Sequence, residues 1–159
     1  MNKQALLSVL ITQLEGDLMM TKEAAQATYE AATNEESKPE NEYDTRAIEA
    51  SYLAGAQARR ASEIDRALSS FRNLELKAFT TNDPIAATAL VSLSLKDKKT
   101  LIFLLPFGGG TTVAHEGQIV KVVTPVSHLG GALLSLRVGD VAEVKVGQET
   151  LEYEVLEVQ

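Results

Sequence analysis

Residues 3–32 read KQALLSVLITQLEGDLMMTKEAAQATYEAA, and they carry the clearest structural pattern in the chain. Apolar and small residues recur there at alternating spacings of three and four, which predicts a helix packed along its length against another helix. The residues of this stripe change from leucine to alanine and threonine along the chain. The stripe consists of Leu7, Ile11, Leu14, Leu18, Thr21, Ala25, Thr28 and Ala32.

A second stripe with the same period follows, and its residues change in the opposite direction, from small to large. It consists of Tyr43, Ala47, Ala50, Ala54, Gln57, Ala61, Ile64, Leu68 and Phe71. Two helices joined by a short turn lie antiparallel, so small residues would face small ones and large residues would face large ones. The two stripes therefore predict an antiparallel coiled-coil hairpin over residues 1–76.

The segment between the stripes, residues 34–44, reads NEESKPENEYD. Asn34 suits the end of the first helix, and Pro39 suits the first position of the second. Five acids surround the single Lys38: Glu35, Glu36, Glu40, Glu42 and Asp44. Their mutual repulsion costs stability, which leaves two interpretations. Either this is a solvated loop whose acids favour the start of the second helix, or the carboxylates bind something outside the chain.

The second half of the chain, residues 77–159, changes to the pattern of a small α+β domain. Strands rich in Val, Leu and Ile are predicted at 89–95, 101–107, 118–124, 141–146 and 151–158, with one short helix at about 127–136. Residues 80–84 (TTNDP) predict a turn. The Gly108–Gly110 run lacks the Gly-Lys-Ser/Thr ending of a phosphate-binding loop, so a hairpin turn is expected there.

Composition excludes several classes of function. The net charge of −7 and the pI near 4.9 argue against nucleic-acid binding through bulk electrostatics. The chain has no cysteine, no signal-peptide pattern and no apolar run that could span a bilayer, so we expect a cytoplasmic protein without a membrane partner. His115 and His128 each stand alone, and no serine lies in a nucleophile-elbow pattern, which disfavours a hydrolase.

The basic residues within and just after the second stripe allow two interpretations. Arg59, Arg60, Arg66, Arg72 and Lys77 could form a flank that faces RNA or a protein partner. They could instead be surface charges paired with Glu63, Asp65 and Glu75 at helical spacing, which is the interpretation we favour.

Residues 123–158, VTPVSHLGGALLSLRVGDVAEVKVGQETLEYEVLEV, resemble the C-terminal domain of the Gre family of bacterial transcript-cleavage factors. Residues 36–43, ESKPENEY, resemble the acidic turn of the same family's helical hairpin. The resemblance implies a coiled-coil finger followed by a small FKBP-like domain, with an antiparallel β-sheet and one short helix, that docks at the rim of the secondary channel of RNA polymerase. The finger would then place acids beside the active-site Mg²⁺ of the polymerase. Such a factor stimulates the polymerase's own hydrolysis of the backtracked RNA 3′ end, and it is not an enzyme by itself.

The family motif can be carried over residue by residue. A gapless match at Glu42-Tyr43 places Glu36 at the family's aspartate position and Pro39 at its glutamate position, whereas a slip of one residue pairs Glu40-Asn41 with the family's Glu-Asn. The resemblance thus implies Glu36 and Glu40 as ligands of a Mg²⁺ ion shared with polymerase, and no cofactor bound by the chain alone. It implies a hairpin tip of Glu35, Glu36, Glu40, Asn41, Glu42, Tyr43 and Asp44.

The family's docking segment aligns with Ser127, His128, Leu129 and Gly131. The family has proline where His128 stands, and often a basic residue where Gly131 stands. The chain therefore resembles a divergent branch of the family. We expect a monomer whose partner is RNA polymerase and which affects the nascent RNA 3′ end only indirectly.

Three other functions remain open at this stage. A regulator with the same docking could inhibit or modulate polymerase without cleavage. An FKBP-like peptidyl-prolyl isomerase would need an aromatic pocket, for which this half offers only Phe79, Phe103, Phe107 and Tyr153. A coiled-coil adaptor would pair its hairpin with other hairpins.

Overall fold

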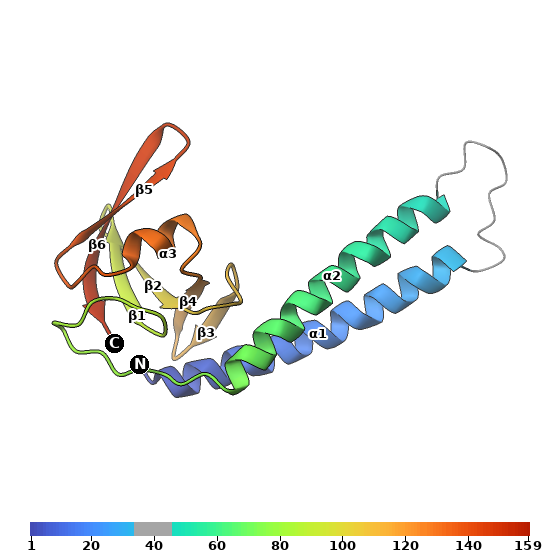
Figure 1. Cartoon of the computed structure of the whole chain (residues 1–159), viewed down its shortest axis with the longest axis horizontal. Helices are drawn as coiled ribbons and strands as arrows, with labels where there is room; N and C mark the ends of the chain where they lie inside the picture. The colour runs from blue at the N-terminus through green and yellow to red at the C-terminus, as the bar shows by residue number, and fades with distance from the viewer. Residues whose placement is uncertain (34–45) are drawn as a thin grey trace. The chain divides into compact units, whose positions relative to one another are not determined.

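The computed structural model of the chain describes residues 1–33 and 46–159 (Figure 1). It confirms the predicted α+β order: a helical hairpin, built from α1 (Lys3–Thr33) and α2 (Arg46–Arg72), precedes a sheet domain with one short helix. Contacts group Met1–Leu10 and Ser70–Gln159 into a sheet unit and Ile11–Ser69 into a hairpin unit. The sequence assigned residues 1–76 to the hairpin, whereas the contacts place the start of α1 and the end of α2 in the sheet unit.

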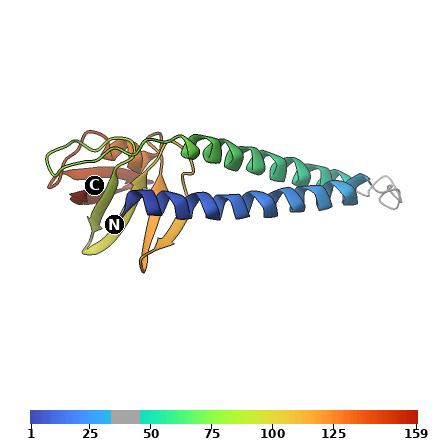
Figure 2. The same cartoon turned by 90° about the horizontal axis from the view of Figure 1, so that it is seen from below.

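The hairpin unit has the predicted seam. Figures 1 and 2 both show α1 and α2 side by side, and every described seam residue of this unit is buried or half-buried. At the large end Leu14, Ile64 and Leu68 are at most 3% exposed. Toward the other end the seam residues are alanine, threonine and Gln57, and they are half-buried. The predicted seam positions are therefore the buried or half-buried ones in the described part of the hairpin, and large residues give way to small ones along them.

The polar residues of the seam differ in whether their side chains find hydrogen-bond partners. Thr21 and Thr28 donate their hydroxyl protons to backbone carbonyls four residues earlier, Asp17 O at 2.7 Å and Ala24 O at 2.8 Å. Gln57 differs, because its buried Oε1 has no hydrogen-bond partner among the described residues. A polar residue at one seam position lowers stability but fixes the register of two packed helices.

The sheet unit contains six strands in the order β3-β4-β2-β1-β6-β5. Their bounds are Leu90–Leu95 for β1, Lys98–Leu104 for β2, Thr112–His115 for β3, Gln118–Val123 for β4, Val141–Val146 for β5 and Glu149–Val158 for β6. All neighbouring pairs in this sheet are antiparallel except β2 and β4, which are parallel. The predicted antiparallel sheet is therefore wrong at one pair: the sheet is mixed, because the chain passes from β2 through the edge strand β3 before β4 returns beside β2 in the same direction.

Two expectations for this half are wrong in detail. The glycine run does not form a hairpin turn, because it connects β2 to β3 and these strands are not neighbours: β4 lies between them. The short strand β3 was not predicted. A hairpin does form one strand later, between β3 and β4. Its turn is Glu116-Gly117, where both residues have positive φ, as a tight two-residue turn requires.

The core of the sheet unit lies between the sheet and α3 (His128–Leu133), which packs over one face of the sheet (Figure 1). Strand residues Val91, Leu93 and Val155 meet Leu133 of α3 there, and all four are at most 1% exposed. The aromatic side chains expected for an isomerase pocket occupy separate environments. Phe103 is fully buried, Phe79 and Tyr153 pack against this core, and Phe107 is exposed.

The start of α1 is fastened to the segment before β1 by Lys3. Its Nζ donates to the carbonyl oxygens of Lys77 and Thr88, the latter at 3.0 Å, and lies 4.8 Å from the centre of the Phe79 ring. Burial lowers the pKa of Lys3. The predicted turn at 80–84 is present: Thr80 donates its backbone N–H and its hydroxyl to Asp83 Oδ2, both at 2.7 Å, and these bonds lower the pKa of Asp83.

None of the helices in residues 3–33, 46–72 and 128–133 combines the length and apolarity that a membrane crossing needs.

Two leucines of α2 test the seam. Leu68 is 2% exposed and Leu53 is 53% exposed. We expect Leu68→Ala to lower the free energy of unfolding by about 2–5 kcal/mol, because it removes buried methyl groups and leaves a cavity. Leu53→Ala should change it by about 0.5 kcal/mol or less, as surface substitutions usually do. Urea unfolding followed by far-UV circular dichroism measures both, and equal losses would contradict the seam.

Candidate functional site

The predicted metal-sharing tip lies outside the described residues. Residues 34–45 include all seven predicted tip residues: Glu35, Glu36, Glu40, Asn41, Glu42, Tyr43 and Asp44. Their roles stay predictions. Along the chain they follow Thr33, the last residue of α1, and precede Arg46, the first of α2. The hairpin unit thus determines which helix ends this acid-rich segment connects.

The predicted docking segment is described, and the structure divides its residues into two kinds. Ser127 caps α3: its Oγ accepts from the Gly130 N–H at 3.0 Å and donates to Thr124 O at 2.7 Å. Leu129 is half-buried and packs against the core. His128 and Gly131 are exposed and, being three residues apart, lie on the same side of α3. Ser127 and Leu129 therefore hold the segment in place, whereas His128 and Gly131 are open to a partner.

Sequence reasoning missed the residue that fixes this segment, Gly130. A Cβ built on Gly130 would lie 2.0 Å from Thr124 O, far inside contact distance. Only glycine allows α3 to come this close to the backbone of the preceding turn. The sequence signal was the Gly130-Gly131 pair, in which the first glycine has the structural role and the second is open to solvent.

Two apolar residues beside His128 were also missed. Val126 is 94% exposed, and Leu134 directly follows α3 and is also exposed. We define the docking patch as Val126, His128, Gly131 and Leu134. An almost fully exposed valine directly before a helix cap gains nothing from burial within the chain. Its neighbours make it the apolar part of a small surface that a partner could cover.

The hairpin unit also exposes large side chains away from its seam. Tyr29 on α1 and Ile48, Tyr52 and Leu53 on α2 are each more than half exposed. A shallow groove of about 730 Å³ runs between the two helices beside Tyr29. Its lining includes the small α2 residues Ser51, Gly55 and Ala58, together with the predicted seam residues Ala25, Ala54 and Ala61. The sequence analysis did not single out the four exposed large side chains. The signal for them was that they are large and apolar but do not lie at seam positions.

The basic residues of α2 follow the favoured interpretation where the structure gives a pair. Arg60 and Glu63 approach to 3.7 Å at a spacing of three residues, and both side chains are more than half exposed. A pair in this setting contributes little to stability. It does not require an external anion.

Metal and acid–base chemistry find little support in the described residues. Residues 1–33 and 46–159 contain no group of three or more His, Cys, Asp or Glu side chains placed to hold a metal ion. The His115 Nε2 lies 3.4 Å from Glu116 Oε1, at the β3–β4 turn. His128 is on the docking patch, so the structure does not bring the two histidines into one site.

Comparisons with known proteins give distant likenesses to solved structures. No protein-family model matches the chain, and no curated protein matches it. GreA factor homolog 1 (Gfh1) of Thermus thermophilus is 17% identical, with 94% of each chain covered and a TM-score of 0.38. Gfh1 of Thermus aquaticus is 19% identical, with 98% of this chain and 95% of that chain covered and a TM-score of 0.39.

A further solved structure, the prokaryotic transcription elongation factor GreA/GreB from Nitrosomonas europaea, is 19% identical. The alignment covers 60% of this chain and 78% of that chain, with a TM-score of 0.37. All these TM-scores are below 0.5. Likenesses this distant do not assign a function to this chain.

The two glycines of α3 offer a matched test of the docking segment. Gly130→Ala should unfold or strongly destabilise the sheet unit, because the new methyl group would overlap Thr124 O. Gly131→Ala should be tolerated, since its nearest contact would be Pro125 O at 3.4 Å, and it should gain up to about 1 kcal/mol of helix propensity. Thermal unfolding compares them, and a stable Gly130→Ala protein would contradict the close approach.

Proposed function

We propose that this protein is a Gre-type regulator of bacterial RNA polymerase that presents the acids of residues 34–44 to the polymerase's catalytic centre. One observation carries the proposal: the predicted seam positions of α1 and α2 are buried or half-buried along their described length. A hairpin whose two helices pack along a seam can present the segment that joins them. The acid-rich segment is the one that joins these two helices.

The chemistry of the acids fits a shared magnesium ion. Mg²⁺ prefers oxygen ligands, keeps several waters and needs only one or two added carboxylates. Glu36 and Glu40 offer such oxygens, and carboxylates of ordinary pKa are ionised at neutral pH. The ion belongs to the polymerase, where two-metal chemistry hydrolyses phosphodiesters. The part of this chain is to bring two negative oxygens to that centre on a slim support.

The sheet unit would supply the attachment to polymerase through the docking patch. Val126 and Leu134 offer apolar contact, and His128 offers a hydrogen-bonding group. Because Gly130 and the Ser127 cap fix α3 to the preceding turn, the patch is presented in one conformation. A preformed patch loses little conformational entropy when a partner binds.

A second candidate function differs only at the tip: the protein would occupy polymerase and slow or modulate extension without promoting cleavage. Pro39, which stands at the family's glutamate position in the gapless match, favours this candidate. Proline supplies no carboxylate oxygen. The two candidates share the partner and the hairpin, and they differ in whether RNA becomes shorter.

The double variant Glu36→Ala/Glu40→Ala tests the tip. Mixed with stalled, backtracked polymerase complexes and Mg²⁺, the unaltered protein should shorten the RNA from its 3′ end. The variant should lose roughly 10-fold or more of that rate, since each carboxylate stabilises a charged centre. Gel electrophoresis of RNA labelled at its 5′ end measures how fast the RNA is shortened from its 3′ end.

A matched control keeps the same loss of charge. Glu23 on α1 and Glu75 after α2 are exposed acids outside the tip, and Glu23→Ala/Glu75→Ala should cleave like the unaltered protein. Blocked extension without shorter RNA would select the second candidate. Absence of any effect on extension or on RNA length would contradict both.

The docking patch has its own test. We expect Val126→Asp/His128→Ala to weaken capture of purified RNA polymerase by about 10-fold, because a carboxylate would replace an apolar contact. The fold should be unaffected, since both side chains are exposed. Val146→Asp, at another exposed valine, should bind normally. Equal binding by all three proteins in a surface plasmon resonance titration would contradict docking through this patch.

A further inference from the structure

Strand β5 lies at one end of the sheet and has a neighbouring strand, β6, on one side only (Figure 1). The antiparallel register places Val146 opposite Glu149 across a two-residue turn. In such a hairpin, backbone hydrogen bonds to the neighbour alternate along the strand and begin with the pair that closes the turn. Val146 and every second residue before it therefore bond to β6. The remaining residues of β5 direct their backbone N–H and C=O groups away from it: Val141, Glu143 and Lys145.

These outward backbone groups have no partner within residues 1–33 and 46–159. No backbone hydrogen bond outside the β5–β6 ladder reaches Val141, Glu143 or Lys145. All three residues are exposed. In the same described ranges, the side chains of Glu143 and Lys145 form no ion pair. An unpaired strand edge of this kind is a template for a further strand.

The two charged residues of this edge make it complementary to a second copy of itself. Glu143 and Lys145 are two residues apart, so their side chains lie on the same face of the sheet. When two copies of β5 pair antiparallel about Val144, Glu143 of each copy lies opposite Lys145 of the other. The outward backbone groups of these same residues also face one another, so backbone hydrogen bonds and two ion pairs would form together.

Other registers of the two copies are less favourable. Centring the pair on Glu143 places two carboxylates opposite each other, and centring it on Lys145 places two ammonium groups opposite each other. A slip by one residue sets outward backbone groups against residues that already bond to β6. The other edge strand, β3, reads TVAH and has neither an acid nor a lysine to match. Charge and hydrogen bonding therefore select the same register of β5 with β5.

Pairing of the two copies would also offset a repulsion inside each chain. Glu143 lies directly opposite Glu152 of β6, whereas Lys145 lies opposite the uncharged Thr150. Like charges directly opposite on neighbouring strands lower stability. A second copy would bring its Lys145 to the free side of Glu143. The two facing glutamates would then have a cation beside them.

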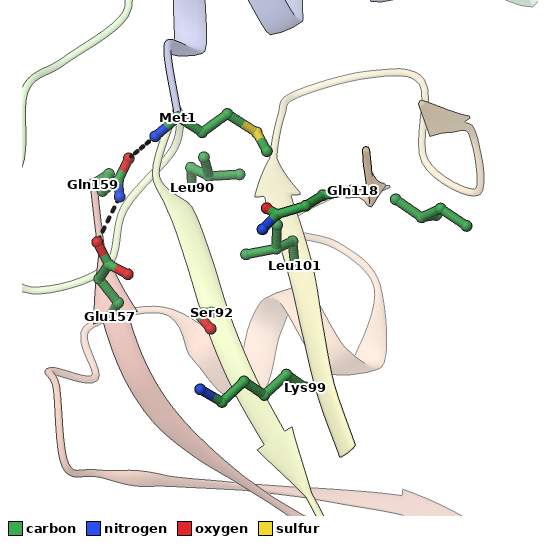
Figure 3. Close-up of a pocket in the computed structure, with 9 residues that line it drawn as sticks. Met1, Leu90, Ser92, Lys99, Leu101, Gln118, Glu157 and Gln159 are labelled. Carbon is green, nitrogen blue, oxygen red and sulfur yellow. Dashed lines mark hydrogen bonds between the residues drawn. The ribbon is translucent and has the colours of Figure 1, made fainter. Parts of the chain in front are cut away.

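The groove over the middle of the sheet lacks this selectivity (Figure 3). It has a volume of about 620 Å³. On one side of it the Met1 ammonium donates to Gln159 Oε1 at 3.4 Å, and the Gln159 amide donates to Glu157 Oε1 at 2.5 Å. Its lining also includes Lys99. The groove therefore presents charges of both signs without a repeated pattern, whereas the charges of the β5 edge select one partner.

We propose that two copies of this chain associate through β5 and extend the sheet across a two-fold axis at Val144. The interface is isologous, because the same edge of each copy forms it. Val144, which is 6% exposed, would meet its own copy on the face opposite the ion pairs. An edge of six residues buries little area, so the dimer is weak and forms at high protein concentration. The monomer expected from the sequence would be the form at low concentration.

This inference does not depend on the proposed function, because it uses neither the residues of the tip nor those of the docking patch. Failure of dimer formation would leave polymerase binding untouched. Failure of polymerase binding would likewise leave the β5 edge as it is. The two proposals can therefore fail separately.

Charge reversal in the full chain tests the register. Sedimentation velocity at about 10 µM to about 1 mM protein should show the unaltered chain shifting from monomer to dimer. Glu143→Lys and Lys145→Glu should each raise the dissociation constant about 10-fold, because every facing pair then has like charges. An equimolar mixture of these two variants should dimerise at least as well as the unaltered chain, because every facing pair between the two variants has opposite charges.

Matched controls change the same charges away from β5. Glu75→Lys and Lys121→Glu, at exposed positions outside this strand, should dimerise like the unaltered chain. In a ¹⁵N-labelled sample, exchange of the Glu143 and Lys145 amide hydrogens should slow as the protein concentration rises. The amide of Ala114, which points outward from β3 by the same alternation, should not change.

Three results would each overturn the proposal. The first is an unaltered chain that stays monomeric at about 1 mM. The second is association of the two reversed variants, alone, that equals association of their mixture. The third is slowed exchange at Ala114 in place of Glu143 and Lys145.

Discussion

The size-matched seam between α1 and α2 is the constraint on which the rest of the molecule depends. Two long helices stay together only if their facing side chains fit, and here the buried seam residues are large at one end and the half-buried ones are small toward the other. Leu14, Ile64 and Leu68 supply the buried apolar area. Alanine and threonine continue the seam with less buried area.

In the sheet unit, a close approach between α3 and the turn before it positions the exposed residues. Gly130 lets α3 lie against the turn at Thr124, and the Ser127 cap satisfies the backbone at the start of the helix. These two contacts leave His128 and Gly131 exposed beside Val126. Ser127 and Gly130 thus build the segment, whereas the neighbouring Val126, His128 and Gly131 are exposed and available to a partner.

Acidic side chains recur in places where they lower the stability of the chain. Residues 34–44 contain five acids, and Glu143 faces Glu152 across two strands. We have proposed that the carboxylates of residues 34–44 meet a metal ion shared with polymerase, which would supply the opposite charge in the first case.

Periodicity predicted the helices well because a long seam repeats its signal many times. The strand at Val141–Val146 was also predicted with its observed bounds, since this valine-rich segment lies between Gly139 and Gly147. The four-residue strand β3 was too short to show a period, and the parallel pairing of β2 with β4 depends on contacts that no local pattern carries. Gly130 was missed because its role depends on Thr124, which lies on a different element. The tip residues were predicted from a family resemblance, and they lie outside the described residues.

The most direct measurement places the tip relative to the polymerase's catalytic metal. Fe²⁺ exchanged for Mg²⁺ in the polymerase active centre generates hydroxyl radicals that cut any polypeptide close to it. The account predicts cuts in this chain within residues 34–44 when the protein is bound, and their loss in the Val126→Asp/His128→Ala variant. Cuts in the sheet unit alone, or an uncut chain in a saturated complex, would contradict it.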